Sequence, residues 1–376
     1  MTLSQLKTEI FSGLTISTAL VPEAISFALL VGVSPSAGLW AAFFMAISTS
    51  LLGGQPAIIS GATGATAVIL ASFVSINGEE NAYLAVILAG LIQLIIFISR
   101  LWKIFNLIPQ IVISGFLISL AILILISQIK YFQISNLTIN KQLLMGGVAI
   151  ISALSMFKLS TKIKIPPALI AIIIGSIGGV IFTLPTIGDL STISSNLPKL
   201  TIPIISIDSI LLVLPYSIGI AISGLTESLI AVDHVCSKIG NHSTISPKAK
   251  ETFSQGVGNI ISGLFSSIGG CVLIGQTNLN ISAGSKTRIS SLSASIGLFF
   301  IIILFSTLIQ DLPLAGFIGV MLIVVYETGD WHSLKSKNKL NILVLLITII
   351  TSVWSHNLAF GVILGSITYY LLKNIK

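Results

Sequence analysis

The chain has 376 residues, of which 19 are Lys or Arg and 12 are Asp or Glu, so 8% are charged and the formal net charge is +7. Hydrophobic residues make up 54%, and the mean hydropathy is +1.05. Because a soluble protein carries roughly 25% charged residues, this composition excludes a soluble enzyme, a nucleic-acid-binding protein and a disordered chain. The basic residues are scattered and do not form the clustered patch that binds nucleic acid. The remaining class is a protein that lies in the lipid bilayer.

Apolar segments follow one another along the chain with short polar breaks, and each helical span of a membrane needs about 20 residues. Seven such segments precede a stretch rich in Ser, Thr and Pro at 186–208, and seven follow it. They lie at 11–33, 37–52, 58–76, 82–99, 104–129, 143–157, 167–184, 210–232, 253–265, 272–282, 289–309, 313–326, 340–354 and 358–372. The sequence therefore predicts an all-α polytopic membrane protein with 14 transmembrane segments.

The positions of the basic residues predict the orientation, because cytoplasmic loops carry an excess of Lys and Arg. With a cytoplasmic N-terminus, 16 of the 19 basic residues fall on the inner side. These are Lys7, Arg100, Lys103, Lys158, Lys162, Lys164, Lys238, Lys248, Lys250, Lys286, Arg288, Lys335, Lys337, Lys339, Lys373 and Lys376. We therefore expect a multi-pass protein of the inner (plasma) membrane with both termini in the cytoplasm.

The region between two predicted inner loops, at 251–285, is too short for its topology. It has 35 residues, whereas two complete spans would need about 40 residues and a turn. The region contains Gly269, Gly270 and Gly275, and the first half of the chain has a counterpart at 53–66. In each half the interruption falls at the third segment. Paired interruptions at matching positions of two halves indicate the binding site of a transporter. Since seven is an odd number, the second half must be inverted relative to the first.

Two acidic residues lie deep inside predicted spans, Glu23 in the first and Glu227 in the eighth. A charge at the centre of the bilayer costs roughly 2.5–3.5 kcal/mol, and such residues usually face a cavity or a partner. No Lys or Arg lies deep in any span to neutralise them. Their alternative role is to brace two helices as protonated side chains.

The interrupted segments offer a way to bind an anion without a fixed cation. A helix that begins inside the membrane presents unpaired amides and the positive end of its dipole. The candidate amides are at 62–64 and 275–277, and the side chains of Thr63, Gln276 and Thr277 add hydrogen-bonding groups. Two opposed clusters of this kind suit a small oxyanion such as sulfate or bicarbonate.

Several motifs are similar to those of the SulP (sulfate permease) family of inorganic anion transporters. They are GLT at 13–15, VPEAISFA at 21–28, ISGATGA at 59–65, QGVGNIISGLF at 255–265, the pair Gly269-Gly270, and NISAGSKT at 280–287. The resemblance extends over nearly the whole chain. It implies two inverted seven-span repeats divided between a core domain, at 1–105 and 206–310, and a gate domain, at 106–205 and 311–376.

In this family the third and tenth spans are half-helices, and the anion lies between them against the first span. Carried over by position, the resemblance implies a binding site at Glu23, Phe27, Ala62, Thr63, Gly64, Ile274, Gly275, Gln276 and Thr277. It implies that Glu227, with Glu23, binds the coupling ion. The chain departs from the family in having Glu23 where Gln is common, and Gln276 where some members have Arg. It also stops soon after the last span, so we expect the family's cytoplasmic STAS domain to be naturally absent or removed.

We expect a secondary active transporter of sulfate or bicarbonate, not an enzyme. It would need no metal or cofactor beyond a coupling ion, and its partners would be the inorganic anion, the bilayer and a second copy in a homodimer. We expect the coupling ion to be a proton, because sodium-dependent bicarbonate carriers have Asp at the position of Glu227 and Thr one turn later, where this chain has Ala231. The alternatives are a sodium-coupled bicarbonate symporter, a nucleobase:cation symporter of the same architecture, and an anion channel.

Overall fold

A computed structural model describes residues 1–133, 137–159, 167–193, 196–240, 246–336 and 338–373. Among them are fourteen α-helices, each of which overlaps one predicted span. They are α1 (Leu3–Val31), α2 (Pro35–Leu52), α3 (Gly64–Asn77), α4 (Glu79–Ile98), α5 (Gln110–Gln128), α6 (Ile139–Leu159), α7 (Pro167–Ile181), α8 (Ile207–Ile239), α9 (Pro247–Leu264), α10 (Ile274–Ser282), α11 (Arg288–Gln310), α12 (Leu314–Thr328), α13 (Lys339–Ser355) and α14 (Leu358–Lys373). Lys162, Lys164, Lys337 and Lys376, which were assigned to the inner side, lie outside the described residues.

The remaining elements are short. Three 3₁₀ helices, η1 (Leu101–Leu107), η2 (Ile129–Gln133) and η3 (Trp331–Lys335), connect the longer helices. Two strands of two residues, β1 (Ser60–Gly61) and β2 (Cys271–Val272), each precede a short helix. The predicted segments at 58–76 and 272–282 are therefore each a strand followed by a helix.

Helix length separates the helices that can span a bilayer from those that cannot. In the described part of the chain, seven helices are long and apolar enough to cross a membrane. Helix α10 has nine residues and so is about 14 Å long, less than half of a hydrocarbon core of roughly 30 Å. The prediction of a shortened tenth segment is confirmed, whereas the number of crossings stays a prediction.

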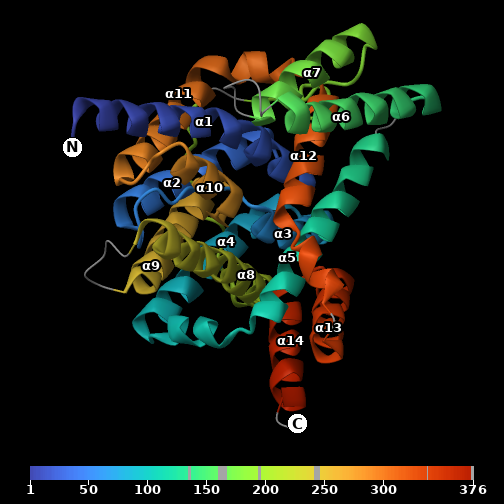
Figure 1. The fold of residues 1–376 in the computed structure, drawn as a ribbon. Helices are drawn as coiled ribbons and strands as arrows, with labels where there is room; N and C mark the ends of the chain where they lie inside the picture. The colour runs from blue at the N-terminus through green and yellow to red at the C-terminus, as the bar shows by residue number, and fades with distance from the viewer. Residues whose placement is uncertain (134–136, 160–166, 194–195, 241–245, 337, 374–376) are drawn as a thin grey trace.

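The helices pack in two groups (Figure 1). In the first, α1 packs against α11, and α4 packs against both α8 and α9. In the second, α12 packs against α5, α6 and α7, while α13 lies beside α14. Contacts between the groups are made chiefly by α1 with α7 and α12, α3 with α5, and α8 with α14.

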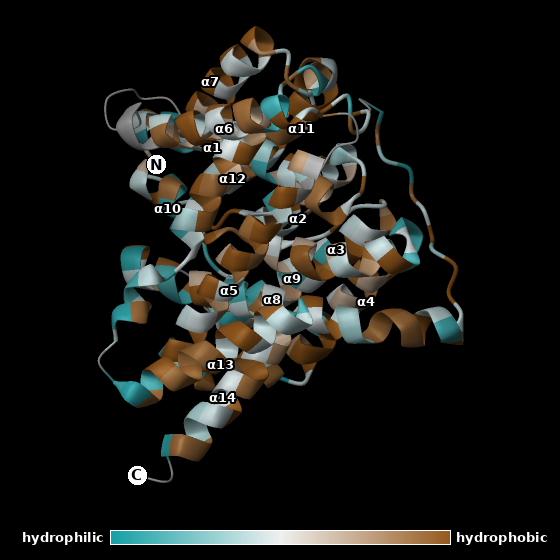
Figure 2. Ribbon diagram, turned by 90° about the vertical axis from the view of Figure 1, so that its right-hand side faces the viewer, coloured by the Kyte–Doolittle hydropathy of each residue, from teal (hydrophilic) through white to brown (hydrophobic). Residues whose placement is uncertain are grey.

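The outer surface of the molecule is apolar, as a bilayer requires. Figure 2 shows mainly hydrophobic residues along α7 and α13. Their large side chains are exposed, for example Val180 at 72% and Ile350 at 62%. A water-soluble protein would not expose such a large apolar surface, so the chain is a membrane protein with many spans.

Candidate functional site

The antiparallel pair β1–β2 brings the N-termini of α3 and α10 together. Ser60 pairs with Val272, and Gly61 pairs with Cys271. The backbones approach so closely here that a Cβ atom added at Gly270 would lie 1.8 Å from the carbonyl oxygen of Gly61. Glycine at this position therefore permits the pairing, and the two halves of the chain meet at the starts of their short helices.

A buried asparagine holds the approach to β2 in place. The side-chain Oδ1 of Asn259, on α9, accepts a hydrogen bond from the amide of Gly270 at 2.9 Å. Its Nδ2 donates to the carbonyl oxygen of Gly270 at 3.1 Å and to Oε1 of Gln93 at 3.0 Å. Buried polar groups are stable only when they are paired, so this network fixes the start of α10 relative to α9 and α4.

A cavity of about 420 Å³ lies at the N-terminus of α10. Its walls come from α1, α8 and α10 of the first helix group and from α5 and α12 of the second. The lining residues are Glu23, Leu117, Glu227, Leu273, Ile274, Gly275, Gln276, Asn278, Leu279, Ser282, Val324, Glu327 and Thr328. The first amides of a helix have no partner within the helix, so the start of α10 presents hydrogen-bond donors and a positive dipole end to this cavity.

Glu23 and Gln276 are joined across the cavity. Nε2 of Gln276 donates a hydrogen bond of 2.6 Å to Oε1 of Glu23. Both side chains are buried, at 7% and 5% exposure. The Oε1 atom of Gln276 is buried without a hydrogen-bond partner among the described residues. One polar atom of a residue that lines the cavity is thus left without a hydrogen bond.

Glu227 is held by a sulfur donor. The thiol of Cys271, on β2, donates to Oε2 of Glu227 at 3.1 Å. The hydroxyl of Thr63 lies 3.1 Å from the same sulfur. A chain of polar contacts therefore runs from the start of α3, through β2, to the carboxylate on α8.

The structure places the predicted site residues in two sets. Glu23, Ile274, Gly275, Gln276 and Glu227 line the cavity. The others are buried beside it and are absent from its lining, namely Phe27, Ala62, Thr63, Gly64 and Thr277.

Two of these buried residues have structural partners. The Thr277 hydroxyl accepts a hydrogen bond of 3.1 Å from the amide of Ile59, so it ties α10 to the strand before α3. Leu120 and Ile124 of α5 cover Gly64, since a Cβ atom added there would lie 2.7 Å from Cδ1 of Ile124. In this structure α5 therefore covers the start of α3, whereas the start of α10 is open to the cavity.

Sequence reasoning missed Glu327, in the last turn of α12. Its side chain is accessible and lines the cavity together with Glu23 and Glu227. The predicted twelfth span ended one residue earlier, so Glu327 was not among the acids placed inside a span. With it, the lining contains three carboxylic acids and no Lys, Arg or His. A Glu in the last turn is disfavoured by the helix dipole, which was the one available signal.

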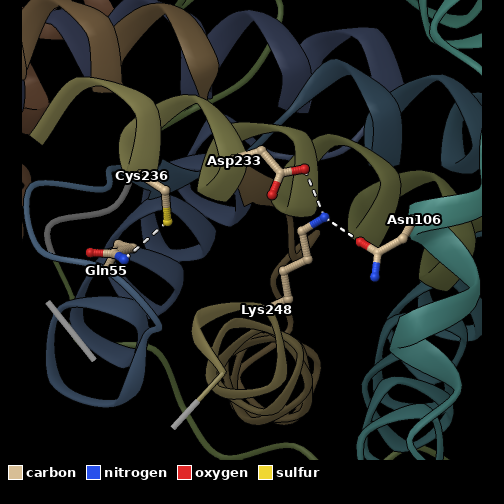
Figure 3. A network of polar contacts seen from close by, with 5 residues as sticks. All are labelled: Gln55, Asn106, Asp233, Cys236 and Lys248. Carbon is tan, nitrogen blue, oxygen red and sulfur yellow. Dashed lines mark hydrogen bonds and ion pairs between the residues drawn. The ribbon is translucent and has the colours of Figure 1, made fainter. Parts of the chain in front are cut away.

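A second polar cluster joins α8, α9 and η1, the connection between α4 and α5 (Figure 3). Nζ of Lys248 lies 2.7 Å from Oδ2 of Asp233 and donates to Oδ1 of Asn106 at 2.5 Å. Nearby, Nε2 of Gln55 donates to the sulfur of Cys236 at 3.1 Å. Since Lys248 is paired, this cluster serves to hold the connection between the two helix groups.

The chain is similar to one known protein family and to several known proteins. A profile described as the Sulfate permease family matches residues 6–144 and 133–351. YbaR of Bacillus subtilis (strain 168), a candidate sulfate transporter, is 36% identical over 381 residues, which cover 99% of this chain and 78% of YbaR. The bicarbonate transporter BicA of Picosynechococcus sp. is 28% identical over 376 residues, which cover 89% of this chain and 63% of BicA.

Solved structures of two transporters have a similar fold. The transmembrane domain of a cyanobacterial bicarbonate transporter BicA is 26% identical, with a TM-score of 0.83, and the match covers 96% of this chain and 98% of that domain. The murine anion transporter Slc26a9 in the inward-facing state is 17% identical, with a TM-score of 0.81 over 100% of this chain and 69% of that protein. At this identity the second likeness concerns the fold alone.

Proposed function

Because the chain belongs to the sulfate permease family, whose members are transporters and not enzymes, we propose that it is a secondary active transporter of a small inorganic oxyanion, sulfate or bicarbonate. The observation that carries the proposal is the cavity of about 420 Å³ at the start of α10. The chain also has relatives described as a sulfate transporter and as a bicarbonate transporter, and these support the same class of substrate.

The anion is bound by backbone amides rather than by a basic side chain. The N-terminus of α10 supplies the positive end of a helix dipole and free N–H groups. Nothing lies within 4 Å of a Cβ atom added at Gly275, so an anion has room to approach the backbone there. Glu23 and Gln276 form the wall next to it.

The coupling ion is a proton carried by Glu227. Sodium prefers several oxygen ligands around a carboxylate, and the neighbouring hydroxyls are already engaged. The Ser228 hydroxyl accepts a hydrogen bond of 3.2 Å from the amide of Val272, and Thr226 donates to the carbonyl oxygen of Ile222 at 2.8 Å. Ala231, one turn after Glu227, has no side-chain oxygen.

Transport occurs by alternating access between a core domain, at 1–105 and 206–310, and a gate domain, at 106–205 and 311–376. The division is supported by the packing of the helices into two groups with the cavity between them. We further propose that the protein lies in the inner membrane with cytoplasmic termini, as the basic residues predict, and that it functions as a homodimer.

Uptake into proteoliposomes tests the proposal. Purified protein should take up labelled sulfate or labelled bicarbonate, and uptake should rise when the outside is made more acidic than the inside. A sodium gradient without a pH gradient should have no effect. Uptake that needs sodium and ignores pH would favour the sodium-coupled bicarbonate symporter, and uptake of neither anion would contradict the proposed function.

A further inference from the structure

The cavity is lined by three acids and by no basic side chain. Glu23 faces it from α1, Glu227 from α8 and Glu327 from α12. The lining residues of α5 and α10 carry no charge, so no basic group within the lining offsets the three acids. An ionised carboxylate accepts hydrogen bonds and donates none, so each of these acids in its ionised form favours a ligand that brings its own hydrogen.

A second feature points to the same ligand. Oε1 of Gln276 is buried without a partner, on a side chain that is 5% exposed and lines the cavity. Its orientation is set by the amide nitrogen, which donates to Glu23. A buried acceptor left without a hydrogen bond is unfavourable, and a ligand hydroxyl would satisfy it. The fully deprotonated sulfate ion has no hydrogen to donate, whereas bicarbonate has one.

The charge of the anion also favours bicarbonate over sulfate. The repulsion between a carboxylate and an anion is proportional to the charge of the anion. A dianion is therefore repelled twice as strongly as a monoanion in the same place. The amides at the start of α10 attract both, but a partial positive charge of about half a unit at a helix end is smaller than the full charge of one ionised carboxylate.

We propose that Glu327 and Gln276 make the cavity selective for singly charged oxyanions that carry a hydroxyl hydrogen, of which bicarbonate is the simplest, over dianions such as sulfate. This inference rests on the proposed transport of an oxyanion and names the class of anion. The oxygens without hydrogen bind the amides at the start of α10, and the hydroxyl donates to the acceptors opposite them. Because Gln276 lies on α10 and Glu327 on α12, the two helix groups select the anion together.

Glu327 is the more informative position, because its substitution changes charge and leaves the packing of the buried residues alone. In wild-type proteoliposomes, at a pH where bicarbonate is the main carbonate species, the KM for bicarbonate should be lower than that for sulfate. Glu327→Gln should lower the KM for sulfate about tenfold and that for bicarbonate about threefold, since removal of one charge helps a dianion twice as much in free energy. The matched control is Glu80→Gln, which removes an exposed acid outside the cavity and should leave both values unchanged.

A second variant tests the hydroxyl acceptor. Gln276→Met keeps the length of the side chain and removes Oε1. The KM for bicarbonate should therefore rise about tenfold, and the KM for sulfate should rise less. A wild type that prefers sulfate, or a Glu327→Gln variant that changes both anions equally, would overturn the inference and leave the proposed transport intact. A folded wild type that carries neither anion would overturn both.

Discussion

The two buried acids of the site have different hydrogen-bond donors. Glu23 receives its hydrogen bond from the amide of Gln276, and Glu227 receives one from the thiol of Cys271. An amide is a better donor to a carboxylate than a thiol, which donates weakly. Glu227 is therefore the acid whose protonation disturbs its surroundings less, as the proposed coupling requires.

Neutralising Glu227 and Glu23 one at a time shows which of the two acids carries the proton. Glu227→Gln should abolish the rise in uptake on external acidification, because the side chain can no longer exchange a proton. Glu23→Gln should retain that rise and change the KM instead. Initial rates over a series of external pH values give the result. If Glu23→Gln loses the pH dependence and Glu227→Gln keeps it, Glu23 carries the proton.

The two glycines of the predicted site should respond differently to the same substitution. At Gly275 a Cβ atom meets nothing within 4 Å, whereas at Gly64 it would lie 2.7 Å from Cδ1 of Ile124. Gly275→Ala should keep thermal stability near that of the wild type and raise the KM, since the methyl group enters the cavity. Gly64→Ala should lower stability by about 1 kcal/mol through crowding against α5. Equal losses of stability in both variants would contradict this assignment.

At the scale of elements, the site depends on where α10 begins. This helix is short, and its first residue is positioned by contacts of residues outside the helix. The pairing of β1 with β2 sets its direction, and Asn259 fixes the backbone of Gly270 from α9. The position of α10 therefore depends on α9, although α9 contributes no residue to the cavity.

Removing the asparagine side chain should displace α10. Asn259→Ala breaks three hydrogen bonds and leaves the buried amide of Gly270 without its partner. We expect a loss of about 2–3 kcal/mol in stability, together with a strong loss of transport. Thermal unfolding in detergent and uptake at a temperature where the variant stays folded separate the two effects. Asn81→Ala, in the first turn of α4, is the control, because it removes a single hydrogen bond from a half-buried side chain far from Gly270 in the sequence. Normal transport by folded Asn259→Ala would contradict the proposed role.

Hydrophobic runs in the sequence located the helices because each run is long and its polar breaks are clear. The shortened segment at 251–285 followed from a length deficit, and α10 confirms it. The strands β1 and β2 could not be predicted, since two residues carry no periodicity. Glu327 was missed because its place in the cavity lining depends on how α12 packs against α1, which no local pattern specifies.

At the scale of the whole molecule, the cavity lies where the two helix groups meet. Its walls come from α1, α8 and α10 on one side and from α5 and α12 on the other. On the predicted topology α12 ends on the cytoplasmic side, so Glu327 lies toward the cytoplasm and the cavity faces inward. On the opposite side, Leu120 and Ile124 of α5 cover the start of α3.

Cysteine labelling tests this orientation. In a background in which Cys236 and Cys271 are replaced, single cysteines at Glu80 and Asp189 should react with an impermeant reagent added outside intact cells. A cysteine at Lys335 should react only after the cells are opened. Reaction of Lys335 and Glu80 from the same side would contradict the predicted topology.

Counterflow in proteoliposomes tests the central claim, that this protein is a carrier of a small oxyanion. Vesicles loaded with unlabelled bicarbonate are diluted into labelled bicarbonate, with sulfate measured in parallel. A carrier that exposes one site alternately to each side should accumulate the label transiently above equilibrium, and vesicles with Gly275→Ala should accumulate less at low anion concentration. Label that only approaches equilibrium, or that follows the membrane potential as the Nernst relation requires of a channel, would contradict the account.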